Sequence, residues 1–378
     1  MDRGIYLDNA ATTRLHPAVR DAMEPFLHDL IGNPSSLHEA GRAARRAVEQ
    51  ARADVASAMG AEADEIVFTS GGTEADAMAL LGVSRRLGKT GIVTTAIEHE
   101  AVQSAVQWLE EAGCTAKWAA PDADGVVSVE SVLAQVDEGT GLASVIWVNN
   151  ETGAIQPIAA LAGELAKRGV LLHTDAVQAF GELAIDVREL PVAALTVSAH
   201  KVHGPKGAGV LFLRRGTPFS AVMRGGGQER NRRGGTENVA AIVGCAKALS
   251  LAAAEREQRV RALAEMRARF CDVLGREADG VRFHAYDGAA SHIVNVAFEG
   301  VLAETLLIDL DLQGIAASSG SACTSGSHQV SHVLRAMGIS EAEARSSTRF
   351  SFAVDNTLGE VECAARIVAD SVERLRRL

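Results

Sequence analysis

The feature that most limits the fold of this chain is a series of short apolar runs that alternate with helical segments. Such runs are typical of buried strands, and strands that alternate with helices form parallel sheets. The series therefore predicts an α/β fold built on an open, largely parallel sheet. The predicted strands span residues 65–69, 91–95, 143–148, 170–175, 195–198 and 209–213.

Helix signals mark where the connecting segments begin and end. An alanine and arginine pattern predicts a helix from His38 to Met59, which Gly60 closes. Thr73 and Asp76 resemble a capping box at the start of a helix that continues to about residue 86. Further helices are expected over residues 237–274, 302–313 and 357–378, the last with its own capping box.

Composition indicates two domains. With 378 residues and 47% hydrophobic content, the chain can bury a large core and can divide. The pattern changes to long charged helix at about residue 256. We expect a large domain at residues 15–255 and a smaller α+β domain formed by residues 1–14 and 256–378.

Charge argues against nucleic acid as the main partner. The net charge is −11, which repels a polyanion. A glycine and arginine stretch at residues 224–236 resembles an RNA-binding segment, but it is short and contains Glu229. We expect it to be a loop that presents Thr236 at a helix N-terminus. The start of the chain has no signal region and no apolar run is long enough for a bilayer, so we expect a cytoplasmic protein without membrane contact.

The five cysteines are too far apart for a zinc site or a redox dithiol, so we expect no metal. Cys245 and Cys271 have apolar helical neighbours and are expected to be inert. Cys323 lies among serines and glycines, which favours an accessible, reactive thiol. An incidental cysteine in a solvated loop fits the same composition.

Polar residues follow most of the predicted strands. In open parallel sheets, ligands collect beyond the carboxyl ends of the strands, so these residues predict a binding site. They are Thr73, Glu98, His99, Asn149, Asn150, Asp175, Gln178 and the stretch 198–201.

Lys201 is the best candidate for a lysine that forms a Schiff base with a carbonyl cofactor. Such an amine must be partly desolvated and held still, and Lys201 follows an apolar strand and precedes a glycine-rich turn. A surface lysine at a strand end is the plainer alternative. The other lysines lie in predicted loops, helices or an edge strand, except Lys206, which is farther from the strand end.

Other candidates each have a structural alternative. Two glycines before Thr73 make a phosphate seat at a helix N-terminus, or Thr73 is only a cap. Asp175 can pair with a pyridinium nitrogen or cap the next helix, where Gln178 would share its face. His99 can stack on a ring and move protons or be structural. Arg349 can clamp a substrate carboxylate or lie on a solvated strand face.

Taken in order, these segments resemble a cysteine desulfurase of the NifS/IscS type, in the class V aminotransferase family of fold-type I pyridoxal phosphate enzymes. The resemblance covers the chain almost end to end. The segments that carry it are residues 6–13, 32–36, 69–74, 98–99, 149–153, 173–178, 198–201, 225–230, 235–238 and 318–325.

The resemblance implies pyridoxal 5'-phosphate as cofactor and assigns a role to each candidate. Lys201 would hold the cofactor, Asp175, Gln178 and His99 would contact its ring, and Asn150 and Arg349 would bind the substrate carboxylate. Thr236 would reach the phosphate of a neighbouring subunit, which implies a homodimer. The residues that would bind the phosphate within the subunit are Gly72, Thr73, Ser198 and His200.

The implied reaction takes sulfur from L-cysteine, leaves a persulfide on Cys323 and releases alanine. Its acceptor, an iron–sulfur scaffold or a tRNA or DNA modification protein, stays open. A selenocysteine lyase or a small-molecule aminotransferase is the nearest alternative, although the Cys323 loop resembles the long-loop group. Ala77 and Glu182 depart from common family residues, and the expected end at Leu378 lacks the extension with which housekeeping members engage their scaffold.

Overall fold

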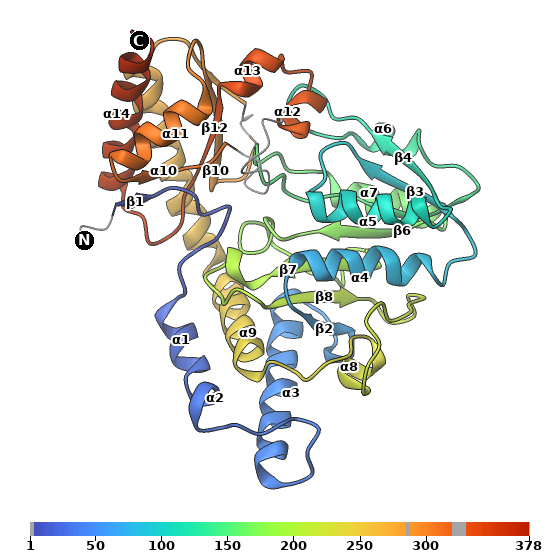
Figure 1. Ribbon diagram of the computed structural model, residues 1–378. Coiled ribbons are helices and arrows are strands. Elements are labelled where there is room, and N and C mark those ends of the chain that lie inside the picture. Colours follow the sequence, from blue (N-terminus) through green and yellow to red (C-terminus); the bar gives the residue numbers. More distant parts are fainter. Residues whose placement is uncertain (1–3, 285–287, 320–329, 378) are drawn as a thin grey trace.

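The computed structural model describes residues 4–284, 288–319 and 330–377. Its centre is a seven-stranded sheet in the order β2-β8-β7-β6-β5-β3-β4 (Figure 1). Neighbouring strands are parallel except where β8 pairs with β2 and β7. The prediction of a largely parallel sheet is confirmed. The strands are β2 Ile66–Thr69, β3 Gly91–Thr95, β4 Thr115–Ala119, β5 Thr140–Ser144, β6 Leu171–Asp175, β7 Ala194–Ser198 and β8 Gly209–Leu213.

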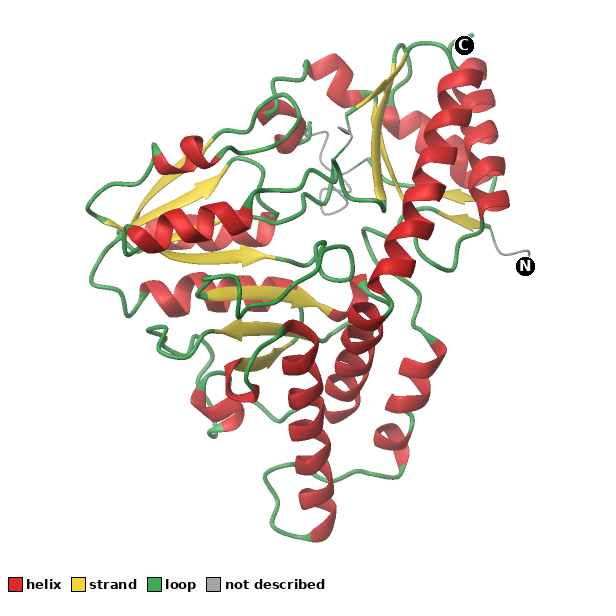
Figure 2. Cartoon of the chain, turned by 180° about the vertical axis from the view of Figure 1, so that it is seen from behind, coloured by secondary structure: helices red, strands yellow, loops and turns green. Residues whose placement is uncertain are grey.

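Helices cover both faces of this sheet, as Figure 2 shows from behind. Successive residues of a strand enter different cores: Val67 packs with α4 and α5, whereas Phe68 packs with α3, α7 and α9. This alternation is the reason why the strands are apolar throughout. The helices of this unit are α1 Pro17–Met23, α2 Pro25–His28, α3 Glu39–Met59, α4 Gly72–Ser84, α5 Glu100–Glu111, α6 Val129–Leu133, α7 Ile158–Lys167, α8 Gln228–Asn231 and α9 Val239–Ala254.

A separate core joins the start of the chain to its last third. Leu7 packs there with Phe270, Phe350 and Val361. Strands β9 Val281–Phe283, β10 Ile293–Phe298 and β12 Ser347–Ser351 form an antiparallel sheet, and β1 Ile5–Tyr6 pairs with β11 Ile315–Ala316. The helices are α10 Arg256–Glu277, α11 Ala303–Leu312, α12 His332–Ala336, α13 Glu341–Arg345 and α14 Leu358–Leu375.

The division into residues 15–255 and residues 1–14 with 256–378 remains a proposal. The second core supports it, but Val333 and Leu334 of α12 pack with the larger core. Among the described residues, none of the helices has the length and apolar content needed to cross a membrane.

Four local predictions are wrong. The helix expected over 237–274 is broken at Glu255, because α9 packs in the larger core and α10 in the smaller one. The strand expected at 143–148 begins earlier, at Thr140, and ends at Ser144. Thr73 and Asp76 form no capping box, because Gly71 is the N-cap. No helix follows Asp175, where the chain forms turns. The capping box of Thr357 and Glu360 is confirmed.

Candidate active site

A cavity of about 280 Å³ lies where the larger core meets the N-terminal segment and strand β12. It gathers residues from segments that are far apart in the sequence, so it exists only in the folded chain. Ten residues predicted from the sequence line it: Gly72, Thr73, His99, Asn150, Asp175, Gln178, Ser198, His200, Lys201 and Arg349.

Lys201 ends the single 3₁₀ turn, Ala199–Lys201, that follows β7. Its Nζ donates to the main-chain oxygens of Ala10, at 2.6 Å, and Ala11, at 2.8 Å. The side-chain hydroxyl of Thr13 donates to the main-chain oxygen of His200 and ties the same segment to this turn. The amine is therefore part-buried and held by two carbonyls, which is the environment expected of a reactive lysine.

Asp175 is the last residue of β6, and its Oδ1 accepts from the main-chain N–H of Val177 at 2.9 Å. Burial raises the pKa of Asp175, while the nearby His99 and Lys201 charges lower it. A cation facing this carboxylate would offset the cost of burial. The expected alternative, a cap for a following helix, is excluded because turns follow.

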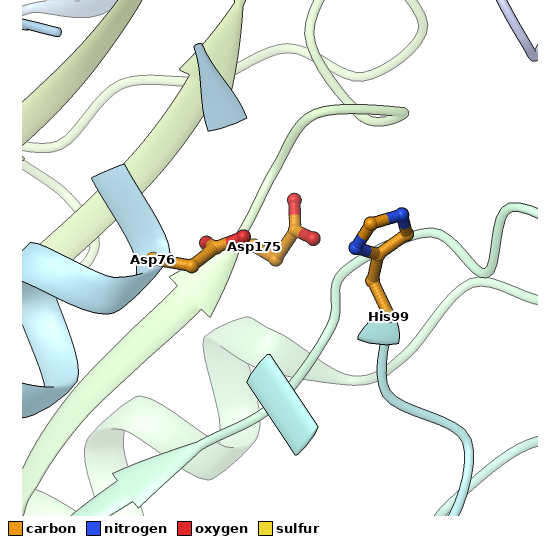
Figure 3. Close-up of side chains that lie close together, drawn as sticks. All are labelled: Asp76, His99 and Asp175. Carbon is orange, nitrogen blue, oxygen red and sulfur yellow. The ribbon is translucent and has the colours of Figure 1, made fainter. Parts of the chain in front are cut away.

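Asp76 is a neighbour that sequence reasoning missed. Figure 3 shows Asp175 between Asp76 and the ring of His99, and polar atoms of the three lie within 4.8 Å of one another. Burial first, and then the Asp175 charge, raise the pKa of Asp76 well above its usual value. Asp76 is thus a second buried carboxyl group beside Asp175. From the sequence, Asp76 was interpreted only as part of a capping box with Thr73, so its place beside Asp175 was not predicted.

His99 is the N-cap of α5, and its Nδ1 accepts from the main-chain N–H of Ala101 at 3.1 Å. Its single proton in the neutral form is therefore on Nε2. Burial lowers the pKa of His99, and the Lys201 charge lowers it further, while Asp175 raises it. The ring is thus a neutral donor beside the cavity.

The N-terminus of α4 and the end of β7 form a seat for an anion. The N-cap of α4 is Gly71, which has no side chain to cap the helix, and Gly72 and Thr73 line the cavity. Ser198 Oγ is buried and has no hydrogen-bond partner among the described residues. Burial, then the charges of Lys201 and Lys206, lower the pKa of His200 to about 4, so this ring is neutral. A phosphate in this seat would accept hydrogen bonds from the main-chain N–H groups at the start of α4 and from the Ser198 hydroxyl.

Gln178 lies in a turn, so the predicted shared helical face with Asp175 does not exist. Its Nε2 donates to the main-chain oxygen of Ala10 at 2.9 Å. Its Oε1 lies 3.0 Å from Nε2 of His292, a residue that sequence reasoning missed.

Arg349, on β12, is only 2% exposed, so the reading as a solvated strand residue is wrong. One terminal nitrogen of its guanidinium donates to the main-chain oxygen of Asn150, and the other donates to Asp8, both at 2.8 Å. These bonds fix the plane of the guanidinium at the cavity wall, next to Asn150.

Three of the predicted site residues do not line this cavity: Glu98 and Asn149, which are buried, and Thr236, which is exposed. Cys323 lies outside the described residues. The residues on either side of its segment do reach the site: Ser318 exchanges main-chain hydrogen bonds with Arg349, and His332 lines the cavity.

Sequence reasoning missed His332, and it named Glu98 at a strand end without giving it a role. His332 Nε2 lies 2.9 Å from the main-chain oxygen of Glu98, which makes this nitrogen the donor. Burial raises the pKa of Glu98 to about 8, although hydrogen bonds from Thr95 and the Ile146 main chain lower it. The only sequence signal near His332 is Ser331, a residue type that often caps a helix. Helix caps of this kind are common, so the signal does not single out a functional residue.

Residues 5–363 match the family model described as aminotransferase class-V. A cysteine desulfurase from Bradyrhizobium diazoefficiens is 43% identical over 98% of this chain and 95% of its own length. A solved structure described as a NifS-like protein covers 98% of this chain and 100% of its own, with 34% identity and a TM-score of 0.92. A structure titled SspA in complex with cysteine has 34% identity and a TM-score of 0.82, over 92% of this chain and 99% of its own.

Proposed function

Because this chain belongs to the class V aminotransferase family as a cysteine desulfurase, we propose that it takes sulfur from L-cysteine at the cavity around Lys201. It releases L-alanine and holds the sulfur as a persulfide on Cys323. The observation that carries the proposal is the meeting of ten independently predicted residues in one cavity.

The residues present fit pyridoxal 5'-phosphate. When bound, it supplies an aldehyde carbon that joins an amine and a ring that accepts the electrons of a broken bond. Lys201 would hold the aldehyde, and Asp175 would face the ring nitrogen. The buried Ser198 hydroxyl and the uncapped start of α4 fit the phosphate. At Gly72 a Cβ would come within 3.0 Å of Val177 Cγ2, so this wall has no room for a side chain.

Lys201 and Arg349 act on different groups of the substrate. Arg349, held flat by Asp8 and the Asn150 carbonyl, binds the carboxylate of cysteine together with Asn150. Lys201 Nζ removes the proton from the substrate α-carbon, because it is the amine that the Ala10 and Ala11 carbonyls hold in the cavity.

Cys323 accepts the sulfur. Its thiolate attacks the sulfur of the substrate, so an S–S bond forms as the substrate C–S bond breaks. The electron pair of the C–S bond stays with carbon, which takes a proton and becomes the methyl group of alanine. Two residues on either side of the Cys323 segment support this role: Ser318 exchanges main-chain hydrogen bonds with Arg349, and His332 lines the cavity. The thiol must stay reduced, which favours the cytoplasm.

The enzyme works as a homodimer in this proposal, with Thr236 reaching the phosphate site of the second subunit. Thr236 is exposed and does not line the cavity of its own subunit, so its side chain is available for that contact. Leu27, Ile31 and Leu37 are 59%, 81% and 90% exposed near α1 and α2, and an apolar surface of this kind fits a subunit interface.

To test the dimer, Lys201→Ala and Thr236→Ala subunits are mixed. Alone, the first variant should be inactive and the second should have lower activity than wild type. A composite site predicts that the mixture regains activity, because one of the two sites in a mixed dimer has both native residues. Light scattering measures the mass of each variant. Monomeric protein, or a mixture no more active than its parts, contradicts the proposal.

The test of the reaction compares wild type with Lys201→Ala and Cys323→Ser for alanine and sulfide released from L-cysteine. We expect Lys201→Ala to lose both products and the yellow colour of the bound cofactor. We expect Cys323→Ser to keep the colour but release no sulfide. Undiminished sulfide release by Cys323→Ser would defeat the persulfide step and favour a lyase or an aminotransferase. Trapping the Cys323 persulfide together with the protein that receives its sulfur would identify the sulfur acceptor.

A further inference from the structure

Behind the cavity, a hydrogen-bonded chain runs from Glu182 through His292 to Gln178. His292 Nδ1 lies 3.3 Å from Glu182 Oε2, and its Nε2 lies 3.0 Å from Gln178 Oε1. All three side chains are buried, and Glu182 and His292 do not line the main cavity.

The Ala10 carbonyl fixes which way the amide of Gln178 points. This oxygen accepts from Lys201 Nζ at 2.6 Å and from Gln178 Nε2 at 2.9 Å. The reverse orientation would place the amide oxygen of Gln178 against the carbonyl oxygen of Ala10. Gln178 Oε1 therefore faces His292, whose Nε2 must carry a proton and donate it.

Glu182 determines the state of the other ring nitrogen. Its two oxygens accept from the main-chain N–H and the hydroxyl of Ser291, both at 2.7 Å. Burial alone would raise the pKa of Glu182, but the bonds from His292 and Ser291 lower it to about 2. The carboxylate faces His292 Nδ1, so both ring nitrogens of His292 face hydrogen-bond acceptors.

Two cations near His292 make a proton on its Nδ1 dependent on the Glu182 carboxylate. Gln178, Glu182 and His292 line a void of about 10 Å³, the size of one water, together with Arg259 and Lys201. Arg259 comes from α10 and Lys201 from the turn after β7, so two cations face the same space. Without the Glu182 carboxylate, they would disfavour a positively charged ring.

We propose that Glu182 and His292 are positioning residues that hold the Gln178 amide with its Nε2 toward Ala10 and the cavity. One hydrogen of Nε2 is donated to Ala10, and the second is left for the cavity that Gln178 lines. This inference rests on the proposed function in one respect: the acceptor of the second hydrogen would be the ring oxygen of the cofactor. The hydrogen bond from His292 to Gln178 Oε1 polarises the amide and strengthens this donor.

The first measurement is nitrogen NMR of the holoenzyme labelled at histidine. Loss of a signal in His292→Asn identifies the ring. We expect two protonated nitrogens for His292 at neutral pH in wild type and a single one in Glu182→Gln, which keeps the size of the side chain. An unprotonated nitrogen on His292 in wild type would overturn the proposal.

The second measurement asks whether the chain acts on the cofactor. We expect Glu182→Gln and His292→Asn to shift the visible absorption band in the direction that Gln178→Ala shifts it. Each should lower kcat about tenfold, as expected for a weakened hydrogen bond to a charged group, and change KM for cysteine less. An unchanged band in both variants would also overturn the proposal.

His284 offers a matched control. Its Nδ1 lies 2.8 Å from Asn295 Oδ1 and its Nε2 lies 3.0 Å from Glu343 Oε1, so it repeats the carboxylate–imidazole–amide arrangement. His284 and His292 are both 9% exposed, and none of His284, Asn295 and Glu343 lines the cavity. His284→Asn should lower stability like His292→Asn but leave the absorption band in place.

The two proposals can fail separately. A wild-type protein that releases no alanine or sulfide from L-cysteine would refute the proposed function, whatever the NMR spectrum shows. A fully active enzyme whose His292 is neutral would refute only the positioning role.

Discussion

At the scale of single residues, burial decides the chemistry of the carboxyl groups around the site. Asp175 was predictable because it directly follows an apolar strand. Asp76 was not, because the sequence around it is compatible with a helix cap, and Glu98 was placed at a strand end but its full burial was not predicted. The pairing of Glu182 with His292 joins residues 110 positions apart and has no local signal.

Glu98→Gln tests this effect of burial. Oε1 of Glu98 accepts from Thr95 and the Ile146 main chain, while Oε2 is buried with no hydrogen-bond partner among the described residues. The folded protein keeps the proton up to a pKa of about 8, whereas the unfolded chain loses it near the ordinary value of 4.5. Between these values the folded state binds more protons, so wild-type stability falls as pH rises.

The glutamine variant has no such proton to lose. Its free energy of unfolding should therefore improve relative to wild type from pH 5 to pH 8, by at most about 1.4 kcal/mol per pH unit. Urea unfolding of both proteins at four pH values measures the difference. A difference that stays constant with pH would mean that Glu98 is not protonated in the folded state.

At the scale of elements, the strands were predictable and some boundaries were not. The runs at 66–69, 91–95, 171–175 and 209–213 are almost entirely buried, as expected for strands covered by helices on both faces. β5 starts earlier than expected because Thr140, which gives no apolar signal, already pairs with Gly91 in the sheet. The break at Glu255 was hidden because both helices satisfy helical periodicity.

Gly72→Ala tests the start of α4 as the phosphate seat. Alanine favours a helix, by roughly 0.5–1 kcal/mol, so its local effect is stabilising. The new methyl group would lie 3.0 Å from Val177 Cγ2 and 3.7 Å from Ser198 Cβ and would crowd the seat. We expect an affinity for pyridoxal phosphate lower by about tenfold, measured by titrating the apoprotein.

Gly163→Ala is the control for that substitution. Gly163 also lies in a helix, α7, and nothing is within 4 Å of the position of its Cβ. This variant should keep the affinity of wild type for the cofactor and unfold at a slightly higher temperature. Equal affinities in both variants would place the phosphate elsewhere.

At the scale of the whole molecule, the N-terminal segment connects the two cores to the site. Leu7 packs in the smaller core, Asp8 binds Arg349, and the Ala10 carbonyl binds Lys201. The sequence resemblance indicated that these residues belong to the site, but it did not show that the segment holds the lysine and the arginine at the same time. Contacts of this kind depend on the packing of distant elements.

Asp8→Ala tests this connection. The loss of its bond to the buried guanidinium should let Arg349 turn away from the substrate carboxylate. We expect KM for cysteine to rise about tenfold, with a smaller change in kcat, since the bond removed acts on binding. Asp355→Ala removes an exposed pair with Arg14, at 3.4 Å, and should leave KM unchanged. A lower kcat with wild-type KM would assign Asp8 a different role.

The N-terminal segment also affects when the enzyme can become active during its synthesis. Ile5 pairs with Ile315 and Asp8 binds Arg349, so residues 5 and 8 wait during synthesis for partners that are made much later. The sheet of the larger core needs no such delay, because its strands come from residues 66–213, although Val333 and Leu334 join this core later. A nascent chain that has not reached Arg349 cannot assemble the substrate site. Unfinished chains are therefore kept from releasing sulfide in the cell.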